Sequence, residues 1–352
     1  MKKHNFSAGP SILPDTVMQQ AAEAILNFNN SNLSIIEISH RSSDFMQVIT
    51  KAKELVLELA ELNSDEYEVL FQHGGASTQF IMTAYNLLPI DGKAGFIDTG
   101  TWSSKAIKET KIFGNVETIA SSKDQGYKYI PKDFSVPNDL AYLHVTSNNT
   151  IYGTQYKDFP VTDLPLVADM SSDIFSKKLD FSKFDVIYAG AQKNIGASGT
   201  TLVIIKKSLL GKTGRTIPSM MNYEVQIDKG SMFNTPSVFS IYVSMLYLQW
   251  LKDKGGLEAI EKLNEAKAKI LYDEIDRNPN FVGYANKEDR SLMNVTFNLT
   301  DESKKERFDQ LAAEAGVHAI KGHRSVGGYR ASIYNAMPIE SVQVLVDVMK
   351  AL

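Results

Sequence analysis

One lysine stands among small residues directly after an apolar run, in the segment VIYAGAQKNIGASG at positions 186–199. Residues 186–189 are typical of a buried strand, and glycines interrupt the chain on both sides of Lys193. We therefore expect the Lys193 amine to lie at a strand end, close to crowded backbone. A lysine desolvated in this way has a lowered pKa and can form a Schiff base with a carbonyl group. The alternative is a lysine at a helix start that faces water.

An acidic residue, Asp169, closes another apolar run earlier in the chain, at residues 164–168. In an open parallel sheet the carboxyl ends of the strands share one edge, and ligands bind there. A carboxylate that faces a pyridine nitrogen keeps the ring protonated, so that the ring accepts electrons from a substrate carbanion. Lys193 and Asp169 at neighbouring strand ends thus indicate pyridoxal phosphate as the carbonyl cofactor.

Seven short runs rich in β-forming residues supply the strands that would position this pair. Helical or loop segments separate the runs, and this alternation predicts an α/β fold with a mostly parallel sheet covered on both faces. The seven runs lie at 68–72, 94–98, 116–120, 140–145, 165–169, 185–190 and 200–206.

The pattern changes after two glycines at positions 255 and 256, where a long charged amphipathic helix begins. Its expected apolar side consists of Leu257, Ile260, Leu263, Ile270 and Leu271. An alternating strand at 293–299 follows, and Pro338 starts the last helix. We therefore expect a large cofactor-binding domain over 15–255 and a smaller α/β domain over 256–352. Residues 1–14 are expected near the small domain and the active site.

Composition excludes several function classes. The chain has 352 residues, of which 43% are hydrophobic, and this content suffices for a large core and two domains. A formal net charge of −4 argues against a nucleic-acid-binding surface. The chain has no cysteine, which excludes disulfides and thiolate metal sites. The histidines outside the motifs below show no metal-ligand spacing, so no metal is predicted.

The expected location is the cytoplasm. Residues 1–10 lack the apolar core of a secretory signal. The longest apolar stretch, 238–251, is interrupted by polar residues and is too short for a membrane span.

Beyond the lysine and the aspartate, the amino-acid sequence resembles the phosphoserine aminotransferase family. These are class-V aminotransferases, which belong to the fold-type I pyridoxal-phosphate enzymes. The resemblance extends over nearly all 352 residues, in family order and spacing. The matching stretches are NFSAGPSILP, EISHRSSDF, GGASTQF, NNTIYG, VADMSSDI, YAGAQKNIG, NTPSVFSIY and GHRSVGGYRASIYNAMP.

The resemblance implies a cradle for the phosphate of pyridoxal 5′-phosphate. A glycine pair after the first sheet strand leads into Ala76 and Ser77, and amides at a helix N-terminus bind a dianion well. In the family these two amides and Gln192 hold the phosphate, joined by Asn234 and Thr235 of the partner subunit. A homodimer with shared active sites is therefore expected.

Two further cofactor contacts are implied by the resemblance. Trp102 follows a strand and would stack on the cofactor ring, whereas without the family match a core tryptophan is the better interpretation. Thr150 would donate its hydroxyl to the phenolic oxygen of the ring, although its sequence context alone predicts an ordinary turn.

Substrates of the family carry an α-carboxylate and a second anion, for which bidentate cations are suited. Arg330, on a predicted short strand, would clamp the α-carboxylate. Two His-Arg pairs, His40 with Arg41 and His323 with Arg324, would bind the distal anion, with one pair from the other subunit. The alternative is ordinary surface ion pairing.

One departure from the family affects this anion site. Many members have arginine at the position of Ser77, so the chain lacks a cation near the substrate phosphate, and we interpret this as a subgroup feature. Some members also have serine at the position of Ala8.

The function implied is a reversible ping-pong transamination. Lys193 holds the cofactor and then moves protons, while Asp169 keeps the ring nitrogen charged. L-glutamate gives its amino group to 3-phosphohydroxypyruvate, which yields O-phospho-L-serine for serine biosynthesis and 2-oxoglutarate. The related acid 3-hydroxy-2-oxo-4-phosphobutanoate, of pyridoxine biosynthesis, presents similar anions.

Three alternatives remain at this point. A class-V relative could act on an unphosphorylated substrate, as a serine–glyoxylate aminotransferase does, whereas a desulfurase would need a cysteine. A nucleotide-binding oxidoreductase would need the fingerprint G-x-G-x-x-G, which is absent after the first strand. A non-catalytic binding protein on the same scaffold is disfavoured by the intact lysine and aspartate.

Overall fold

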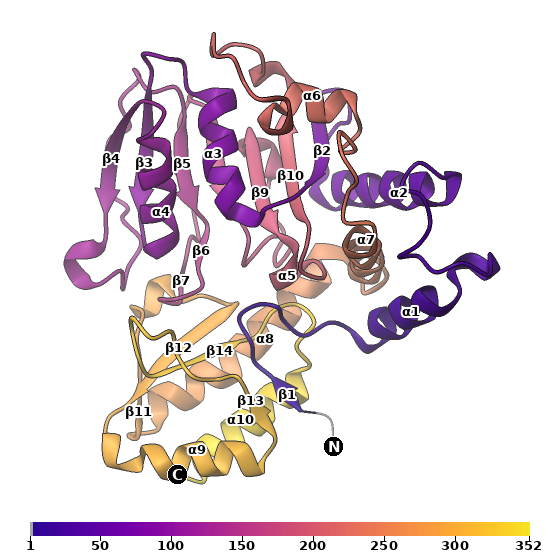
Figure 1. The fold of residues 1–352 in the computed structure, drawn as a ribbon. Helices are drawn as coiled ribbons and strands as arrows, with labels where there is room; N and C mark the ends of the chain where they lie inside the picture. Colours follow the sequence, from indigo (N-terminus) through magenta and orange to yellow (C-terminus); the bar gives the residue numbers. More distant parts are fainter. Residues whose placement is uncertain (1–2) are drawn as a thin grey trace.

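The computed structural model describes residues 3–352 and divides into two lobes (Figure 1). The large lobe is built on a seven-stranded sheet, and the small lobe on a three-stranded sheet. In Figure 1 the large lobe lies above the small lobe, and the chain passes into the small lobe through α8 (Gly256–Arg277).

The seven predicted β-rich runs all form strands of the large sheet, so the predicted α/β fold is confirmed. The strand order is β2-β10-β9-β8-β5-β3-β4, and every strand except β10 runs in the same direction. The bounds are β2 (Tyr67–Gln72), β3 (Lys93–Asp98), β4 (Asn115–Ser121), β5 (Leu143–Thr146), β8 (Leu166–Asp169), β9 (Val186–Gly190) and β10 (Thr201–Lys206).

Both faces of the large sheet are buried except at its edge strand β4, which is partly exposed, and this burial explains why the other strands are largely apolar runs. Side chains alternate between the faces: Val69 and Phe71 of β2 pack in one hydrophobic cluster, whereas Leu70 packs in another. The first cluster contains residues of α2 (Ser43–Ala60) and α7 (Val238–Asp253), and the second contains residues of α3 (Gly75–Leu87) and α4 (Thr101–Thr110). The sheet is therefore a middle layer between two layers of helices.

The other helices of the large lobe are peripheral or short. α1 (Asp15–Leu26) packs against α7, and α6 (Tyr223–Asp228) lies near β2. α5 (Ala191–Asn194) is one turn between β9 and β10, and β6 (Asn148–Asn149) and β7 (Thr154–Gln155) form a small hairpin.

The small lobe has its own hydrophobic core. Its sheet is antiparallel in the order β11-β12-β14, with bounds β11 (Phe281–Gly283), β12 (Asn294–Leu299) and β14 (Tyr329–Ser332). The helices α8, α9 (Lys305–Glu314) and α10 (Ile339–Lys350) contribute buried residues to this core.

The buried face of α8 differs from the expected apolar stripe. Leu257, Ile260 and Leu271 are buried as predicted, whereas Leu263 and Ile270 are only half-buried. In their place the helix buries polar residues, of which Asn264 and Lys267 are both 0% exposed. The reason is that backbone carbonyls of neighbouring segments face this side of α8 and accept their hydrogen bonds.

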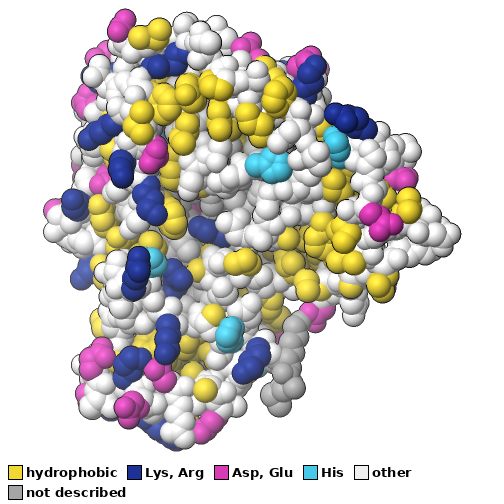
Figure 2. All heavy atoms as spheres, in the orientation of Figure 1, with side chains coloured by type: hydrophobic (Ala, Val, Ile, Leu, Met, Phe, Trp, Pro, Cys, Tyr) yellow, Lys and Arg dark blue, Asp and Glu magenta, His cyan; other side chains and the backbone are white. Residues whose placement is uncertain are grey.

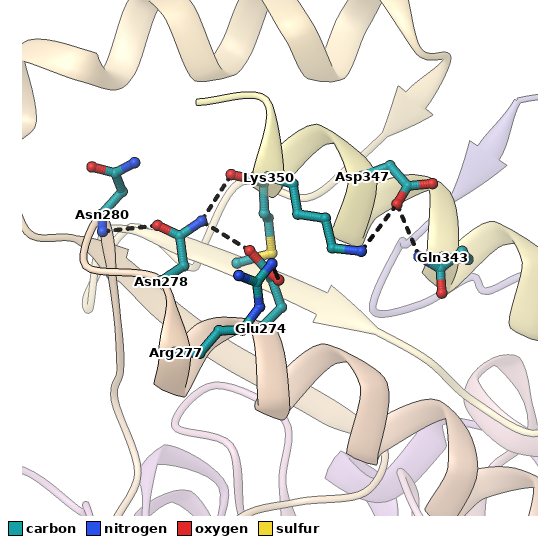
Figure 3. A network of polar contacts seen from close by, with 8 residues as sticks. Glu274, Arg277, Asn278, Asn280, Gln343, Asp347 and Lys350 are labelled. Atoms are coloured by element: carbon teal, nitrogen blue, oxygen red, sulfur yellow. Dashed lines mark hydrogen bonds and ion pairs between the residues drawn. The ribbon is translucent and has the colours of Figure 1, made fainter.

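The end of α8 is fastened to α10 by polar contacts (Figure 3). Asn278, which follows α8, donates hydrogen bonds to the Glu274 carboxylate at 2.9 Å and to the Met349 carbonyl at 3.0 Å. Glu274 is 2% exposed and also pairs with Arg277. The bond from Asn278 gives the Met349 carbonyl a donor near the C-terminal end of α10, where the last carbonyls of a helix have no partner within the helix.

The N-terminal segment joins the small lobe before the chain enters the large one. β1 (His4–Asn5) pairs in parallel with β13 (Val317–His318), and Phe6 is fully buried in the small-lobe core. Among residues 3–352, no helix combines the length and the apolar character that crossing a membrane requires.

Candidate active site

A cavity of about 250 Å³ lies at the carboxyl ends of the parallel strands, on the edge of the large sheet that faces the small lobe. Loops after β2, β3, β5, β8 and β9 line it, which is the place where open α/β sheets bind ligands. The lining residues are Gly74, Gly75, Ala76, Ser77, Trp102, Thr146, Asn148, Thr150, Asp169, Ser171, Ser172, Gly190, Gln192 and Lys193.

Lys193 enters the cavity from α5, the single turn that follows β9. Its amine donates a hydrogen bond to the Thr150 hydroxyl at 2.9 Å and lies 5.5 Å from the centroid of the Trp102 ring. Burial lowers the pKa of Lys193 to about 8, and the Arg330 charge acts in the same direction, whereas Asp169 opposes it. At pH 7 a pKa of about 8 leaves roughly a tenth of this amine uncharged, far more than in an ordinary lysine, and the uncharged form is the one that acts as a nucleophile or base.

Asp169 is the last residue of β8, beside β9 in the sheet, and is 4% exposed. One carboxylate oxygen accepts a hydrogen bond from the Ser171 N–H at 3.0 Å. Burial raises the pKa of Asp169, while the hydrogen bonds from Ser171 and the Lys193 charge lower it. The net direction of the Asp169 pKa is upward, and Ser171 and the Lys193 charge limit the rise.

The N-terminus of α3 opens onto the same cavity. Gly74 has a φ of 87°, and a Cβ there would lie 1.8 Å from the Thr78 hydroxyl oxygen, so only glycine fits this tight turn. The turn leaves the first amides of α3, including those of Ala76 and Ser77, at the cavity wall. Such amides bind a phosphate dianion.

Trp102 lines the cavity from the first turn of α4, next to Lys193. The start of α4 is fixed because Ser103 accepts hydrogen bonds from the N–H groups of Thr99 and Gly100, both at 2.9 Å. Ser103 in turn donates to the Asp98 carboxylate at 2.9 Å. The indole is thereby held on a rigid support.

Arg330 reaches the site from β14 of the small lobe. Its guanidinium donates to the Thr150 carbonyl at 3.3 Å, and burial lowers its pKa. The pKa of His323 is also lowered, first by burial and then by the charges of Arg330, Arg324 and Lys105. Basic side chains therefore gather between the lobes, as Figure 2 shows on the face it presents.

Seven of the predicted cofactor residues line the cavity, namely Ala76, Ser77, Trp102, Thr150, Asp169, Gln192 and Lys193. Asn234 and Thr235 are exposed and do not line the cavity of their own chain. Arg330 touches Thr150 from outside that wall.

The two His-Arg pairs also lie outside the cavity wall. His323 and Arg324 lie near Arg330. His40 and Arg41 precede α2, and within residues 3–352 the buried Nε2 of His40 has no hydrogen-bond partner.

The sequence did not single out several polar residues of the cavity, among them Thr146, Asn148, Ser171 and Ser172. Thr146 is the last residue of β5, Asn148 follows it closely, and Ser171 and Ser172 follow β8, so their position at the ends of buried strands was an available signal. The contacts of Lys193 with the N-terminal segment carried no such signal. Ser11 donates to the Lys193 carbonyl, and a Cβ on Gly9 would lie 3.3 Å from the Lys193 Cγ.

The residues present fit pyridoxal phosphate. The α3 amides suit its phosphate, Asp169 its ring nitrogen, Thr150 its phenolic oxygen, and Lys193 its aldehyde. Within the described residues, Trp102 Nε1 and Thr146 Oγ1 are buried without a hydrogen-bond partner, and both residues line the cavity. Buried polar atoms of this kind are expected where a ligand completes a site.

Comparison with known proteins agrees with this geometry. The family described as "Aminotransferase class-V" matches residues 3–345. The chain therefore belongs to the class-V aminotransferases, which confirms the predicted class of enzyme and rules out the nucleotide-binding alternative.

Similar curated proteins within that class are named phosphoserine aminotransferase. The one from Flavobacterium johnsoniae is 63% identical over 352 residues, covering 100% of this chain and 99% of that protein. The one from Bacteroides fragilis is 54% identical and covers 99% of this chain and 98% of that protein. The resemblance inferred from the motifs is thus confirmed over the whole chain.

Solved structures similar to this chain are also phosphoserine aminotransferases. A phosphoserine aminotransferase from Bacillus circulans has a TM-score of 0.96 at 41% identity and covers 99% of this chain and 98% of that chain. The phosphoserine aminotransferase from Trichomonas vaginalis, described as PLP-bound, has a TM-score of 0.93 at 36% identity and covers 99% and 100%.

Proposed function

We propose that this chain transfers the amino group of L-glutamate to 3-phosphohydroxypyruvate and forms 2-oxoglutarate and O-phospho-L-serine, with pyridoxal 5′-phosphate as cofactor. One observation carries the proposal: Lys193, Asp169 and Trp102 line a single cavity in a chain that is similar over its full length to phosphoserine aminotransferases. The related acid 3-hydroxy-2-oxo-4-phosphobutanoate is a second candidate amino acceptor, because it carries similar anionic groups.

Lys193 and Asp169 are the proposed catalytic residues. When bound, pyridoxal phosphate supplies an aldehyde that captures amines and a ring that withdraws electrons from the substrate α-carbon. The Lys193 amine would hold the cofactor at its aldehyde, and the same amine, once free, would serve as the base that accepts the substrate α-proton and as the acid that donates it back. The buried Asp169 carboxylate keeps a proton on the ring nitrogen.

Binding of the cofactor phosphate extends across a homodimer in this proposal. Ala76, Ser77 and Gln192 line the cavity of their own chain, whereas the exposed Asn234 and Thr235 would complete the cavity of the second copy. Exposed apolar side chains in α1, in α2, between these helices and next to Asn234 support contact with a second copy. They are Met18, Leu26, Leu33, Ile36, Met46 and Phe233.

Substrate anions are assigned to the basic groups between the lobes. Arg330 binds the α-carboxylate, because a planar guanidinium pairs with a carboxylate through two parallel hydrogen bonds. The pairs His40-Arg41 and His323-Arg324 bind the distal anion, and one pair comes from the partner subunit. Ser77 offers a hydroxyl where many relatives offer a cation, so phosphate binding depends more strongly on these pairs.

In this proposal residues 15–255 form the cofactor-binding domain and residues 256–352 the smaller domain, and catalysis occurs between them. The separate cores of the two lobes support this division. Since the substrates are small metabolites, we assign the activity to the cytoplasm.

The test is a comparison of amino acceptors with glutamate as donor. We expect kcat/KM for 3-phosphohydroxypyruvate to exceed that for hydroxypyruvate and for glyoxylate by at least about 100-fold, because the distal phosphate contributes binding energy to the transition state. Parallel lines in double-reciprocal plots would show the ping-pong order. An equal or higher kcat/KM for glyoxylate would instead favour an aminotransferase for unphosphorylated substrates.

A further inference from the structure

Three asparagine side chains meet at one turn of the large lobe, residues 174–176. Each donates a hydrogen bond from its Nδ2 to a different carbonyl of this turn: Asn194 to residue 174 at 2.7 Å, Asn335 to residue 175 at 2.9 Å, and Asn264 to residue 176 at 2.8 Å. The three come from different elements, which are α5, the segment after β14, and α8. We call them the asparagine cluster.

The members of the cluster also bind one another. The Asn335 N–H donates to the Asn194 Oδ1 at 3.0 Å, and Asn264 Nδ2 donates to the Asn335 Oδ1 at 2.8 Å. Asn335 is 1% exposed, and the other two are 0% exposed. Within the described residues, the Asn264 Oδ1 has no hydrogen-bond partner, whereas the other side-chain amide oxygens of the cluster accept hydrogen bonds. A buried network with so many bonds permits few geometries, because each further unpaired amide or carbonyl inside a protein is costly. The cluster therefore fixes its three elements in one arrangement.

Two elements of the cluster, and the turn that they bind, lead directly to residues of the proposed site, whereas α8 connects to no site residue. Asn194 follows Lys193 in the chain, residues 174–176 follow the turn after Asp169, and Asn335 stands shortly after Arg330. Further hydrogen bonds hold the segment between Arg330 and Asn335. The Lys267 amine donates to the carbonyls of Ile333 and Tyr334 at 3.0 and 2.7 Å.

We propose that the asparagine cluster sets the position of Arg330 relative to Lys193, with Asn335 as the central positioning residue. This rests on the proposed function, in which Arg330 binds the substrate α-carboxylate and Lys193 moves the α-proton. The two groups come from different lobes, and their separation must match one small substrate. Displacement of a substrate clamp by about 1 Å can reduce the rate about 100-fold. Apolar packing alone would leave the lobes freer to slide.

Asn335→Asp is the informative variant, because it keeps the acceptor oxygen for Asn264 and removes the donor to residue 175. The matched control is Asn86→Asp in α3. Asn86 is 3% exposed, donates to the carbonyls of Met82 and Met221 at 2.8 Å, and accepts the Tyr223 N–H at 2.9 Å. It thus has a similar hydrogen-bond pattern, far from the cavity lining.

The probe is glutarate, which has the two carboxylates of glutamate and cannot react. Its Kd is measured by calorimetry on the cofactor-loaded protein, together with the Tm of each variant and the Kd of the cofactor. We expect Asn335→Asp to raise the glutarate Kd at least about tenfold relative to Asn86→Asp. The cofactor Kd should stay near the wild-type value, because the phosphate cradle does not involve the cluster.

Two outcomes separate the inference from the function on which it rests. If wild type binds glutarate and Asn335→Asp binds it with the same Kd, the cluster is only structural and the inference is wrong. This holds whether or not the variant has a lower Tm. If wild type and the Arg330→Ala variant bind glutarate equally weakly, the proposed role of Arg330 fails as well. Should Asn335→Asp not fold, Asn264→Asp is measured by the same criterion.

Discussion

At the scale of single residues, the proposed chemistry depends on an amine that the fold partly removes from water. Burial lowers the pKa of Lys193 to about 8, and partial desolvation and the Lys177 charge also lower the pKa of Lys157, an exposed residue outside the cavity, to about 8. A lowered pKa is therefore not sufficient for catalysis. Lys193 differs because Thr150, Trp102 and Asp169 surround it in a cavity.

The first prediction compares these two lysines. Lys193→Ala should abolish transamination, because no other group can hold the aldehyde carbon and move the α-proton. Lys157→Ala should keep near-normal kcat, since the amine of Lys157 lies outside the cavity and donates its hydrogen bond to the Arg290 carbonyl. Steady-state assays with glutamate and 3-phosphohydroxypyruvate measure both. Substantial turnover by Lys193→Ala would end its assignment as the catalytic lysine.

A second prediction concerns the Asp169 carboxylate. Asp169→Asn should lower kcat by about 100-fold or more, because a neutral amide cannot hold the ring nitrogen protonated. The fold should persist, since the amide oxygen still accepts the Ser171 N–H. The control is Asp289→Asn, a carboxylate that is 2% exposed and accepts the Ile130 N–H. Equal kcat values for Asp169→Asn and wild type would contradict the assignment.

At the scale of elements, α8 shows where a hydrophobic pattern misleads. The sequence predicted the helix and much of its buried side, yet Asn264 and Lys267 lie on that side as well. Their partners are carbonyls of distant segments, so no local pattern could indicate their burial. The same holds for the short N-terminal strand, whose pairing with β13 joins opposite ends of the chain.

The third prediction uses the buried Lys267, whose pKa burial lowers to about 7. Between pH 7 and about pH 10 the unfolded chain binds one more proton at this residue than the folded chain, so stability rises with pH in this window. Below pH 7 both states are protonated and this contribution is constant. Lys267→Met should remove a slope of about 1 kcal/mol per pH unit from the free energy of unfolding.

Urea unfolding at several pH values between 7 and 10 measures this slope. The control is Lys269→Met, since Lys269 lies on the exposed side of the same helix and pairs with Asp273. An unchanged slope in Lys267→Met would show that Lys267 stays charged in the folded protein.

At the scale of the whole molecule, the seven strands of the large sheet followed from the sequence pattern. The order and direction of the strands did not follow from the sequence pattern, because a strand buried on both faces is a continuous apolar run whatever its direction. The reversed direction of β10 was therefore not visible in the sequence. Candidate residues could be predicted where an apolar run ended at or shortly before a reactive side chain, as at Asp169 and Lys193, and the other assignments depended on the family resemblance.

The fourth prediction tests sharing of the site between subunits. Thr235→Asp should inactivate the enzyme, because a carboxylate would repel the cofactor phosphate of the second copy. Random pairing of Thr235→Asp with Lys193→Ala chains should restore roughly a quarter of wild-type activity, since half of the dimers contain one intact site. Verified heterodimers without activity would show that Thr235 acts within its own chain.

The central claim is that Lys193 holds pyridoxal phosphate and passes an amino group through it. The most direct measurement is the visible absorption spectrum of the purified protein, before and after glutamate and then 3-phosphohydroxypyruvate are added. We predict a yellow absorption band that glutamate removes and 3-phosphohydroxypyruvate restores, and that the Lys193→Ala variant lacks. A protein that stays colourless after incubation with pyridoxal phosphate, or a band that glutamate leaves unchanged, would contradict the account.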